Sequence, residues 1–263
     1  MISLLIPSKN EEYLQKTIDD IQNKSDVEII VGLDGWTIPL NKEWKPKYPE
    51  KIKWHIETET IGQRAMTNKL ARMSEAEYLM KIDAHCSFSQ GFDKELLDKI
   101  DDKTIMAPYL LRLNPETWEP IPKPASSAFC FDSNLVMQYH KEAENNELLN
   151  ETMCLQGSAW IISRENYWKW NICDESLGGW GGQAAELGIR AFLNGGKCIT
   201  NKNCYYAHLF REKEEEFPYQ RDKGIIFNTL ENLRKKYLNK DLIPLVEKFN
   251  YPCDWKEFVA KLK

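Results

Sequence analysis

The sequence predicts an α/β protein with a mostly parallel central sheet, followed by helices at the C-terminal end. Strand-like apolar runs and helical patterns alternate along residues 2–82. Strands that are separated by a crossover helix form right-handed β-α-β units, and these units build parallel sheets. The chain has 263 residues, of which 42% are hydrophobic and 29% charged. This size and composition allow one large domain with a sizeable core.

The first half of the chain supports this fold element by element. Residues 2–6 and 27–33 are strand-length apolar runs. Between them, residues 11–23 carry apolar side chains at helical spacing, which predicts the first crossover helix. A further strand, helix and strand are expected at residues 51–57, 62–73 and 78–82. In open sheets of this kind, ligands bind beyond the carboxyl ends of the strands.

The second half is less regular. A strand signal at residues 103–108 precedes four prolines within ten residues, which predict a long loop or an edge hairpin. Order returns with an apolar run, a glycine-rich turn and several helices, the last two of them amphipathic. The apolar run is at residues 155–163, and the helices are expected at residues 164–170, 183–194, 225–237 and 255–262. We expect a domain of residues 1–215 with a helical C-terminal extension, residues 216–263, packed on it.

Charge and cysteine content exclude several classes of protein. A formal net charge of -5 argues against broad, sequence-independent binding to nucleic acid, which requires clustered basic residues. No stretch approaches the roughly 20 apolar residues of a membrane span, so none is expected. The N-terminus also lacks the pattern of a signal peptide. Seven cysteines without a C-x-x-C pair predict free thiols and a reducing cytoplasm.

Asp83 and His85 directly follow one strand-like run, and His208 directly follows another. Side chains two residues apart on an extended chain point the same way, so Asp83 and His85 can share a cation. One carboxylate and two imidazoles suit Mn²⁺ (or Mg²⁺), with open positions for phosphate oxygens. Zinc on Cys86 is disfavoured because adjacent side chains of a strand point apart. Local hydrogen bonding is the other interpretation of these histidines.

Six short motifs follow one another along residues 2–211. They are Ile6-Pro-Ser-Lys-Asn-Glu11, Gly32-Leu-Asp-Gly35, Gly62-Gln-Arg64 with Asn68, Asp83-Ala-His85, Gly178-Gly-Trp-Gly-Gly182 with Glu186, and His208-Leu-Phe-Arg211. Their order resembles the nucleotide-sugar glycosyltransferases of the A-type fold, in particular family-2 enzymes and the related polypeptide N-acetylgalactosaminyltransferases. The resemblance implies a single Rossmann-like nucleotide-sugar-binding domain. It also implies sugar transfer from a nucleoside-diphosphate sugar, foremost a UDP-sugar, to a hydroxyl of a glycan or protein, or of a hydroxymethylated base in DNA.

The resemblance assigns donor contacts to several of these residues. Asp34 can accept hydrogen bonds from a uracil N-H or ribose hydroxyls, although Asp-Gly is also an ordinary turn pair. Arg64 and Asn68 share a helix face from which the guanidinium can reach the donor, unless it pairs with a surface carboxylate. Trp180 can stack on a sugar. The expected donor-binding set is Pro7, Asn10, Glu11, Asp34, Arg64, Asn68, Trp180, Gly181 and Gly182.

Two residues are expected to act in catalysis. Arg211, three residues after His208, matches a family position that adds positive charge near the phosphates. The N-acetylgalactosaminyltransferases have Glu directly after W-G-G, where this chain has Gln183. Because Gln cannot take a proton, Glu186 becomes the best remaining carboxylate. It can act as a general base in an inverting reaction or stabilise charge in a retaining one, or simply favour the start of a helix.

Two alternatives from other classes remain. A sugar-nucleotide nucleotidyltransferase shares the β-α-β start, but it needs a glycine-rich basic phosphate loop, and residues 7–12 do not supply one. A non-catalytic carbohydrate-binding protein could also keep this fold. The joint presence of four chemically active side chains argues against that second alternative. They are Asp83, His85, Glu186 and His208.

Overall fold

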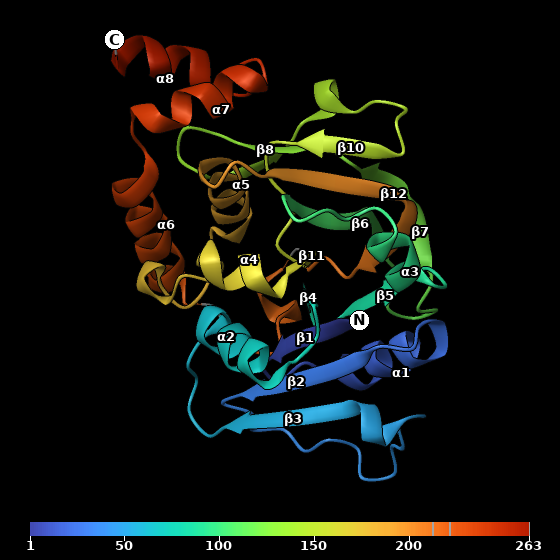
Figure 1. Ribbon diagram of the computed structural model, residues 1–263. Helices are drawn as coiled ribbons and strands as arrows, with labels where there is room; N and C mark the ends of the chain where they lie inside the picture. The colour runs from blue at the N-terminus through green and yellow to red at the C-terminus, as the bar shows by residue number, and fades with distance from the viewer. Residues whose placement is uncertain (212, 221, 263) are drawn as a thin grey trace.

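The apolar runs of the sequence meet in one central sheet in the computed structural model, which describes residues 1–211, 213–220 and 222–262 (Figure 1). The strands are β1 (Ile2–Ser8), β2 (Glu28–Asp34), β3 (Ile52–Glu57), β4 (Tyr78–Ile82), β5 (Cys86–Phe88), β6 (Thr104–Leu113), β7 (Pro120–Ser126), β8 (Phe129–Phe131), β9 (Met137–Tyr139), β10 (Leu149–Thr152), β11 (Ala159–Ser163) and β12 (Lys197–His208). The α-helices are α1 (Leu14–Lys24), α2 (Gln63–Met73), α3 (Phe92–Leu97), α4 (Arg164–Lys169), α5 (Gln183–Leu193), α6 (Lys223–Tyr237), α7 (Ile243–Lys248) and α8 (Trp255–Leu262).

The strand order is β10-β12-β6-β11-β4-β1-β2-β3, with β5 on β12 and β7 on β6. Strands β1, β2, β3 and β4 pair in parallel, as do β6 and β12. Strand β11 is antiparallel to both β4 and β6, so these two groups run in the same direction. The predicted α/β class with a mostly parallel sheet is therefore confirmed. Antiparallel strands β5, β7, β10 and β11 complete it.

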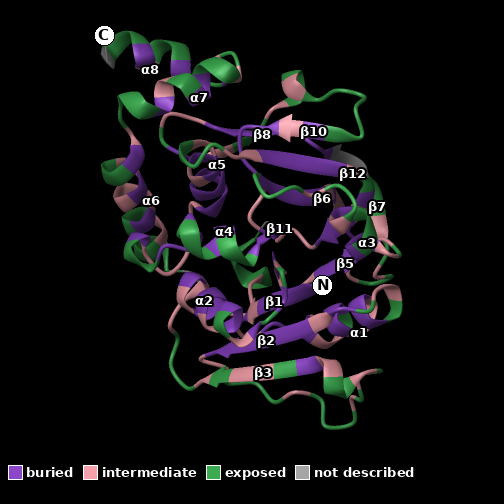
Figure 2. Ribbon diagram, viewed as in Figure 1, coloured by how far each residue is buried: buried purple, intermediate pink, exposed green. Residues whose placement is uncertain are grey.

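Alternation along β1 separates the two faces of this sheet. Leu4 belongs to one hydrophobic cluster together with Ile18 of α1, whereas Leu5 belongs to a second cluster with Met66 of α2. Because successive side chains of a strand point to opposite faces, an unbroken apolar run is buried only when both faces are covered. Figure 2 shows the resulting buried centre of the sheet. Because both faces of the sheet are covered, its strands are apolar on both sides, and this accounts for the unbroken apolar runs in the sequence.

The direction of the strands decides where the site lies. Parallel β1, β2 and β4 bring their carboxyl ends to one edge of the sheet. Strand β12 runs the same way and ends at His208, which pairs with Cys86 of β5. This pairing places His208 beside the Asp83-Ala84-His85 segment that joins β4 to β5. Two segments more than 120 residues apart in the chain are thereby brought to one edge of the sheet.

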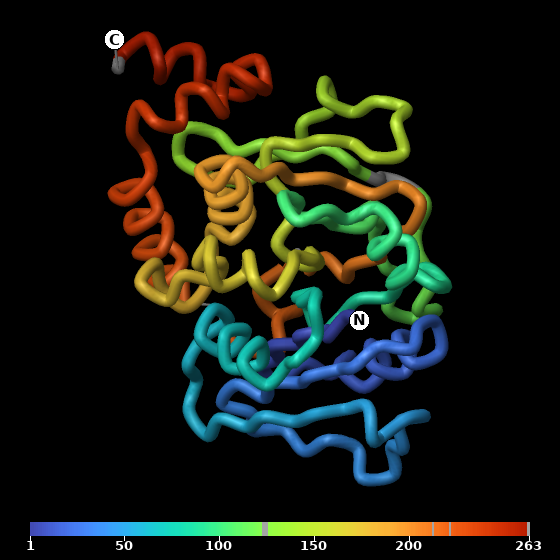
Figure 3. The backbone as a smooth tube through the Cα atoms, in the orientation of Figure 1, coloured from blue at the N-terminus to red at the C-terminus, as the bar shows by residue number. Residues whose placement is uncertain are grey.

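The C-terminal helices belong to the same hydrophobic core as the sheet. Leu233 of α6 and Trp255 of α8 are buried in the cluster that contains β1 and β2. The Trp255 indole donates a hydrogen bond to the Phe131 carbonyl oxygen at 2.7 Å. In Figure 3 α8 lies at the opposite end of the molecule from β3, and α6 runs along one side. The expected division of the chain after residue 215 stays a prediction. Across the described ranges, no helix combines the length and the apolar character that crossing a membrane requires.

Most predicted elements are found, with shifted ends. The first helix begins at Leu14 rather than at residue 11, because Asn10 has a φ of 49° and Glu11 turns its side chain toward the cleft. The proline-rich stretch contains β7, which pairs antiparallel with β6, so the edge hairpin is confirmed. Strand β12 is longer than the strand-like run expected at its C-terminal end. Its first half is mostly polar and therefore gave no strand signal in the sequence. The elements that the sequence did not predict include the short helices α3 and α7 and the short strands β5 and β8 to β10.

Candidate active site

A cleft of about 370 Å³ opens at the edge where β1, β2, β4 and β12 end. The turn before α5 and the segment that leads into α6 close its other side. Many of the residues selected from the sequence line it. These are Pro7, Glu11, Asp34, Asp83, His85, Trp180, His208 and Arg211. Sequence reasoning and topology therefore agree on the location of the site.

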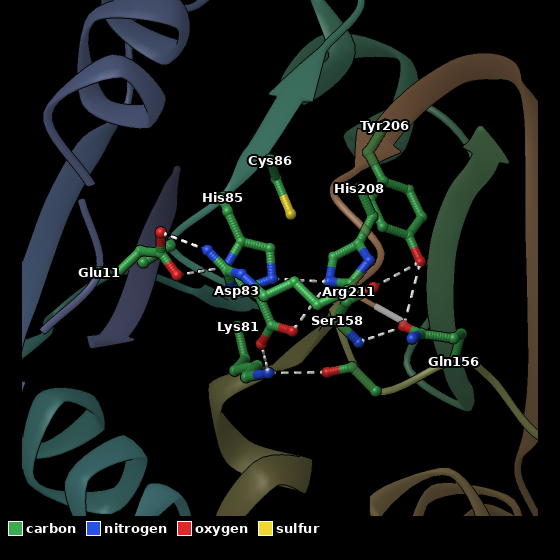
Figure 4. Close-up of polar contacts among 12 residues, drawn as sticks. Glu11, Lys81, Asp83, His85, Cys86, Gln156, Ser158, Tyr206, His208 and Arg211 are labelled. Carbon is green, nitrogen blue, oxygen red and sulfur yellow. Dashed lines mark hydrogen bonds and ion pairs between the residues drawn. The ribbon is translucent and has the colours of Figure 1, made fainter. Parts of the chain in front are cut away.

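Asp83, His85 and His208 form a compact group in this cleft (Figure 4). One ligand atom from each lies within 4.8 Å of the others. The Nε2 atom of His208 is 3.2 Å from Oδ2 of Asp83 and 3.0 Å from Nε2 of His85. One oxygen and two nitrogen donors converge here, a set that can hold a divalent cation of borderline character.

The ionisation of this group favours ligand chemistry. Desolvation raises the pKa of the Asp83 carboxyl, but attraction to Lys81 and the hydrogen bond with His208 outweigh it and hold that pKa well below its usual range. Burial lowers the pKa of His208 to about 4, against the opposing effect of Asp83. At neutral pH the carboxylate is charged and the His208 ring is neutral. Those are the forms that bind metals.

Glu11 orients the third member of the group. Its Oε2 atom lies 2.9 Å from Nδ1 of His85, which leaves Nε2 of the same ring facing His208. Its Oε1 atom accepts a hydrogen bond from Arg211 at 2.8 Å. Desolvation raises the pKa of Glu11, and its contacts with His85 and Arg211 lower it further than desolvation raises it. The carboxylate therefore holds an imidazole and a guanidinium at the cleft wall.

Lys81 was not selected from the sequence, although a lysine inside the apolar run of β4 is the signal that could have found it. Its side chain is completely buried. The ammonium contacts Oδ1 of Asp83 and donates a hydrogen bond to the Gly157 carbonyl oxygen at 2.8 Å. Gln156, which lines the cleft beside this contact, was also missed.

Asp34 and Asn10 both shape loops at the cleft. The Asp34 carboxylate accepts hydrogen bonds from the backbone N-H groups of Ile61 and Gly62, at 2.7 and 3.0 Å. It lines the cleft and also fixes the entry to α2. The Asn10 side chain accepts a hydrogen bond from the Thr37 backbone N-H at 2.8 Å. It also donates one to the Thr37 hydroxyl at 2.9 Å. Asn10 is not among the residues that line the cleft, and its expected donor contact stays a prediction.

Arg64 and Asn68 are packed into the wall of the site. Arg64 is 1% exposed and donates hydrogen bonds to Glu186 and to the carbonyl oxygens of Gly178 and Gly181. Asn68 donates to the Cys173 carbonyl oxygen at 3.0 Å. Their shared face of α2 packs against the segment before α5 and does not line the cleft. These side chains hold the wall of the site, and the expected donor contact stays a prediction.

Glu186 of α5 is the partner of Arg64 in this wall. It is completely buried, and its two oxygens accept hydrogen bonds from Arg64 at 2.9 Å and from the Asp174 backbone N-H at 2.8 Å. It does not line the cleft. A general base must reach the acceptor hydroxyl directly or through one water. In this structure its face of α5 points toward α2, and the expected catalytic role of Glu186 stays a prediction.

The glycine-rich turn is packed between α2 and α6. Trp180 and Gly179 line the cleft, whereas Gly181 and Gly182 face α6. At Gly182, where φ is 64°, an added Cβ would lie 2.2 Å from a methyl carbon of Leu233. Only glycine fits so close an approach in this conformation. The turn thus presents Trp180 to the cleft, and its remaining glycines pack against α6.

Comparison with known families gives one match that covers most of the chain. Residues 3–170 match the family described as "Glycosyl transferase family 2". Two relatives in Drosophila melanogaster are a candidate polypeptide N-acetylgalactosaminyltransferase 13, 26% identical over 86% of this chain, and polypeptide N-acetylgalactosaminyltransferase 8, 23% identical over 85%. This chain spans 41% and 40% of their respective lengths.

Solved structures share the fold. The crystal structure of GalNAc-T7 with UDP, GalNAc and Mn²⁺ superposes with a TM-score of 0.74 and 17% identity, over 99% of this chain and 56% of that one. The crystal structure of S. aureus TarS 1-349 in complex with UDP-GlcNAc superposes with a TM-score of 0.63 and 14% identity, over 100% of this chain and 76% of that one. At these identities the likeness concerns the fold.

Proposed function

This chain belongs to glycosyl transferase family 2, and on that premise we propose that it moves a sugar from a UDP-sugar to a hydroxyl acceptor with the help of a divalent cation. The observation that carries the proposal is the convergence of Asp83, His85 and His208, with Arg211, in one cleft. The structural likeness to GalNAc-T7, which was crystallised with UDP and Mn²⁺, supports the choice of donor and cation.

The residues present fit Mn²⁺ (or Mg²⁺). The donor set of one carboxylate oxygen and two imidazole nitrogens suits such a cation and leaves positions for phosphate oxygens. A carboxylate behind a ligating histidine is the usual partner that orients the ring, and Glu11 stands in this relation to His85. Asp83, His85 and His208 would hold the cation. When bound, it would neutralise charge on the departing diphosphate.

The chain's own residues complete the environment of the donor. Arg211 presents a fixed positive charge to the cleft, and Glu11 keeps its guanidinium in place. Such a pre-oriented charge stabilises a leaving group without reorganisation during the reaction. Asp34 would offer its carboxylate edge, and Pro7 an apolar wall, to the nucleoside. The Trp180 ring can stack on a sugar face. Arg64 and Glu186 would act at a distance, by holding the glycine turn that carries Trp180.

We assign the acceptor to the hydroxyls of glycans or proteins, since the relatives are named as polypeptide transferases. We place the activity in the cytoplasm because all seven cysteines are free thiols and six of them are buried. The test is UDP release from a panel of UDP-sugars, with and without Mn²⁺, in the presence of glycan, peptide and hydroxymethylated DNA acceptors. If the sugar were transferred only to the DNA acceptor, hydroxymethylated DNA would replace glycans and proteins as the proposed acceptor class.

The same assay separates the remaining alternatives. A nucleotidyltransferase would form the sugar nucleotide from a nucleoside triphosphate and release pyrophosphate. A carbohydrate-binding protein would bind sugars without releasing UDP. Release of UDP that depends on both Mn²⁺ and an acceptor supports the proposal, and its absence with every donor and acceptor would refute it.

We expect Glu11→Gln to weaken Mn²⁺ binding by roughly 10- to 100-fold, because the His85 ring loses its charged orienting partner. Titration of the Mn²⁺ electron paramagnetic resonance signal measures the affinity directly. Glu12→Gln is the matched control, since Glu12 is the exposed neighbour of Glu11 in the sequence. Equal affinities in the two variants would show that Glu11 does not support the cation site.

A further inference from the structure

Lys81 is a buried cation next to Asp83, which lines the cleft. It stands opposite Trp160 of β11, and its Nζ atom has two partners, the Asp83 carboxylate and the Gly157 carbonyl oxygen (Figure 4). Taking an ammonium out of water is costly, and a well-packed apolar residue would often serve stability equally well. Core packing alone therefore gives no reason for a lysine here.

The two oxygens of the Asp83 carboxylate have different partners. Oδ1 contacts the Lys81 ammonium, and Oδ2 faces Nε2 of His208 at 3.2 Å. The Asp83 backbone N-H also donates a hydrogen bond to the Ser158 carbonyl oxygen at 2.7 Å. The side chain is therefore fixed in one orientation, with only Oδ2 turned toward the histidines. A cation held here would meet one oxygen of Asp83.

The charges around the group nearly cancel. Lys81 neutralises Asp83, and Arg211 neutralises Glu11. Imidazole rings add no negative charge, so the cluster carries no net negative charge to attract a divalent cation. The affinity of such sites rises with the number of charged ligands and falls when a like charge stands nearby. A diphosphate brings the missing negative charge and oxygen ligands of its own.

We propose that Lys81 is a positioning residue that makes tight binding of the divalent cation depend on the diphosphate of the donor. It holds Asp83 through one oxygen and cancels the charge that would otherwise retain the cation in the empty cleft. Cation and donor then strengthen each other's binding by the same factor, as linkage requires. This inference rests on the cation site of the proposed function.

The test measures Mn²⁺ binding by electron paramagnetic resonance, without and with saturating UDP. For the wild-type protein we expect UDP to tighten Mn²⁺ binding on the order of tenfold or more. Lys81→Met keeps an unbranched side chain but removes the charge. In this variant we expect Mn²⁺ to bind on the order of tenfold more tightly without UDP, and the gain from UDP to shrink. Lys81→Gln gives a second neutral variant if the first does not fold.

Two further variants separate charge from packing. Lys81→Arg keeps the charge and should retain most of the wild-type gain from UDP. Lys24→Met removes the partly exposed ion pair of Lys24 with Asp20, outside the cleft, and should leave Mn²⁺ binding unchanged. Circular dichroism and thermal melting confirm that each variant is folded. A purely structural role of Lys81 would lower the melting temperature without altering the gain from UDP.

The outcomes distinguish this inference from the proposed function. If the wild-type protein binds Mn²⁺ but UDP does not tighten that binding, the inference is wrong. The same holds if folded Lys81→Met and Lys81→Gln bind Mn²⁺ without UDP as weakly as the wild type. If the wild-type protein binds no Mn²⁺ even with UDP, the cation site itself is wrong and the inference falls with it.

Discussion

Asp83→Asn is expected to reduce Mn²⁺-dependent release of UDP by about a thousandfold, with the fold preserved. The amide keeps the shape of the side chain and an oxygen for Lys81, but it offers no charged ligand at the position of Oδ2. Alanine is the poorer choice here, because it would leave the buried Lys81 ammonium without any side-chain oxygen at this position. His208→Ala should have an effect of similar size, since it removes the buried imidazole between Asp83 and His85.

The measurement is UDP release at saturating donor over a range of Mn²⁺ concentrations, alongside thermal melting of each variant. His55→Ala is the control, because His55 lies on edge strand β3 and does not line the cleft. Turnover of Asp83→Asn within a few-fold of the wild type, at all Mn²⁺ concentrations, would remove Asp83 from the cation site.

Glu186→Ala is expected to lower the free energy of unfolding by about 3–5 kcal/mol, the cost of breaking a buried ion pair from one side. The side chains of Arg64 and Glu186 are 1% and 0% exposed, so the guanidinium would lose its charged partner where water does not reach. Urea denaturation followed by circular dichroism measures the change. Glu231→Ala removes a carboxylate from an exposed pair with Arg234 on α6 and should cost less than about 1 kcal/mol.

Glu186→Gln separates the structural role from the catalytic one that the sequence suggested. If Glu186 holds Arg64, the amide should lower stability and donor affinity together, because the glycine turn loosens. If it were a general base, turnover would collapse while stability and UDP affinity stayed at wild-type values. The second pattern would contradict a purely structural role for Glu186 and would support its action as a general base.

The convergence of Asp83, His85 and His208 could be predicted because its evidence is local. Asp83 and His85 stand at the end of an apolar strand, and the two-residue spacing directs both side chains to one side. His208 ends another such strand, and parallel sheets collect strand ends at one edge. The pairing of His208 with Cys86 follows from topology rather than from any signal near either residue.

The roles of Arg64, Asn68 and Glu186 could not be predicted in this way. Helical spacing shows that Arg64 and Asn68 share a face, but it does not show what that face meets. The same limit applied to Glu186 on α5. In the structure these faces meet each other across the glycine turn, away from the cleft.

The sequence by itself determined the α/β class, the order of the main strands and helices, and the convergence of an aspartate and two histidines at the strand ends. These follow from side-chain periodicity and strand direction, which are local properties of the chain. Only the tertiary structure decided that Glu11 supports His85, that Lys81 takes one oxygen of Asp83, and that Arg64 and Glu186 pair in the wall. Each of these contacts depends on how elements pack, and packing is decided by burial across the whole fold rather than by neighbours in the chain.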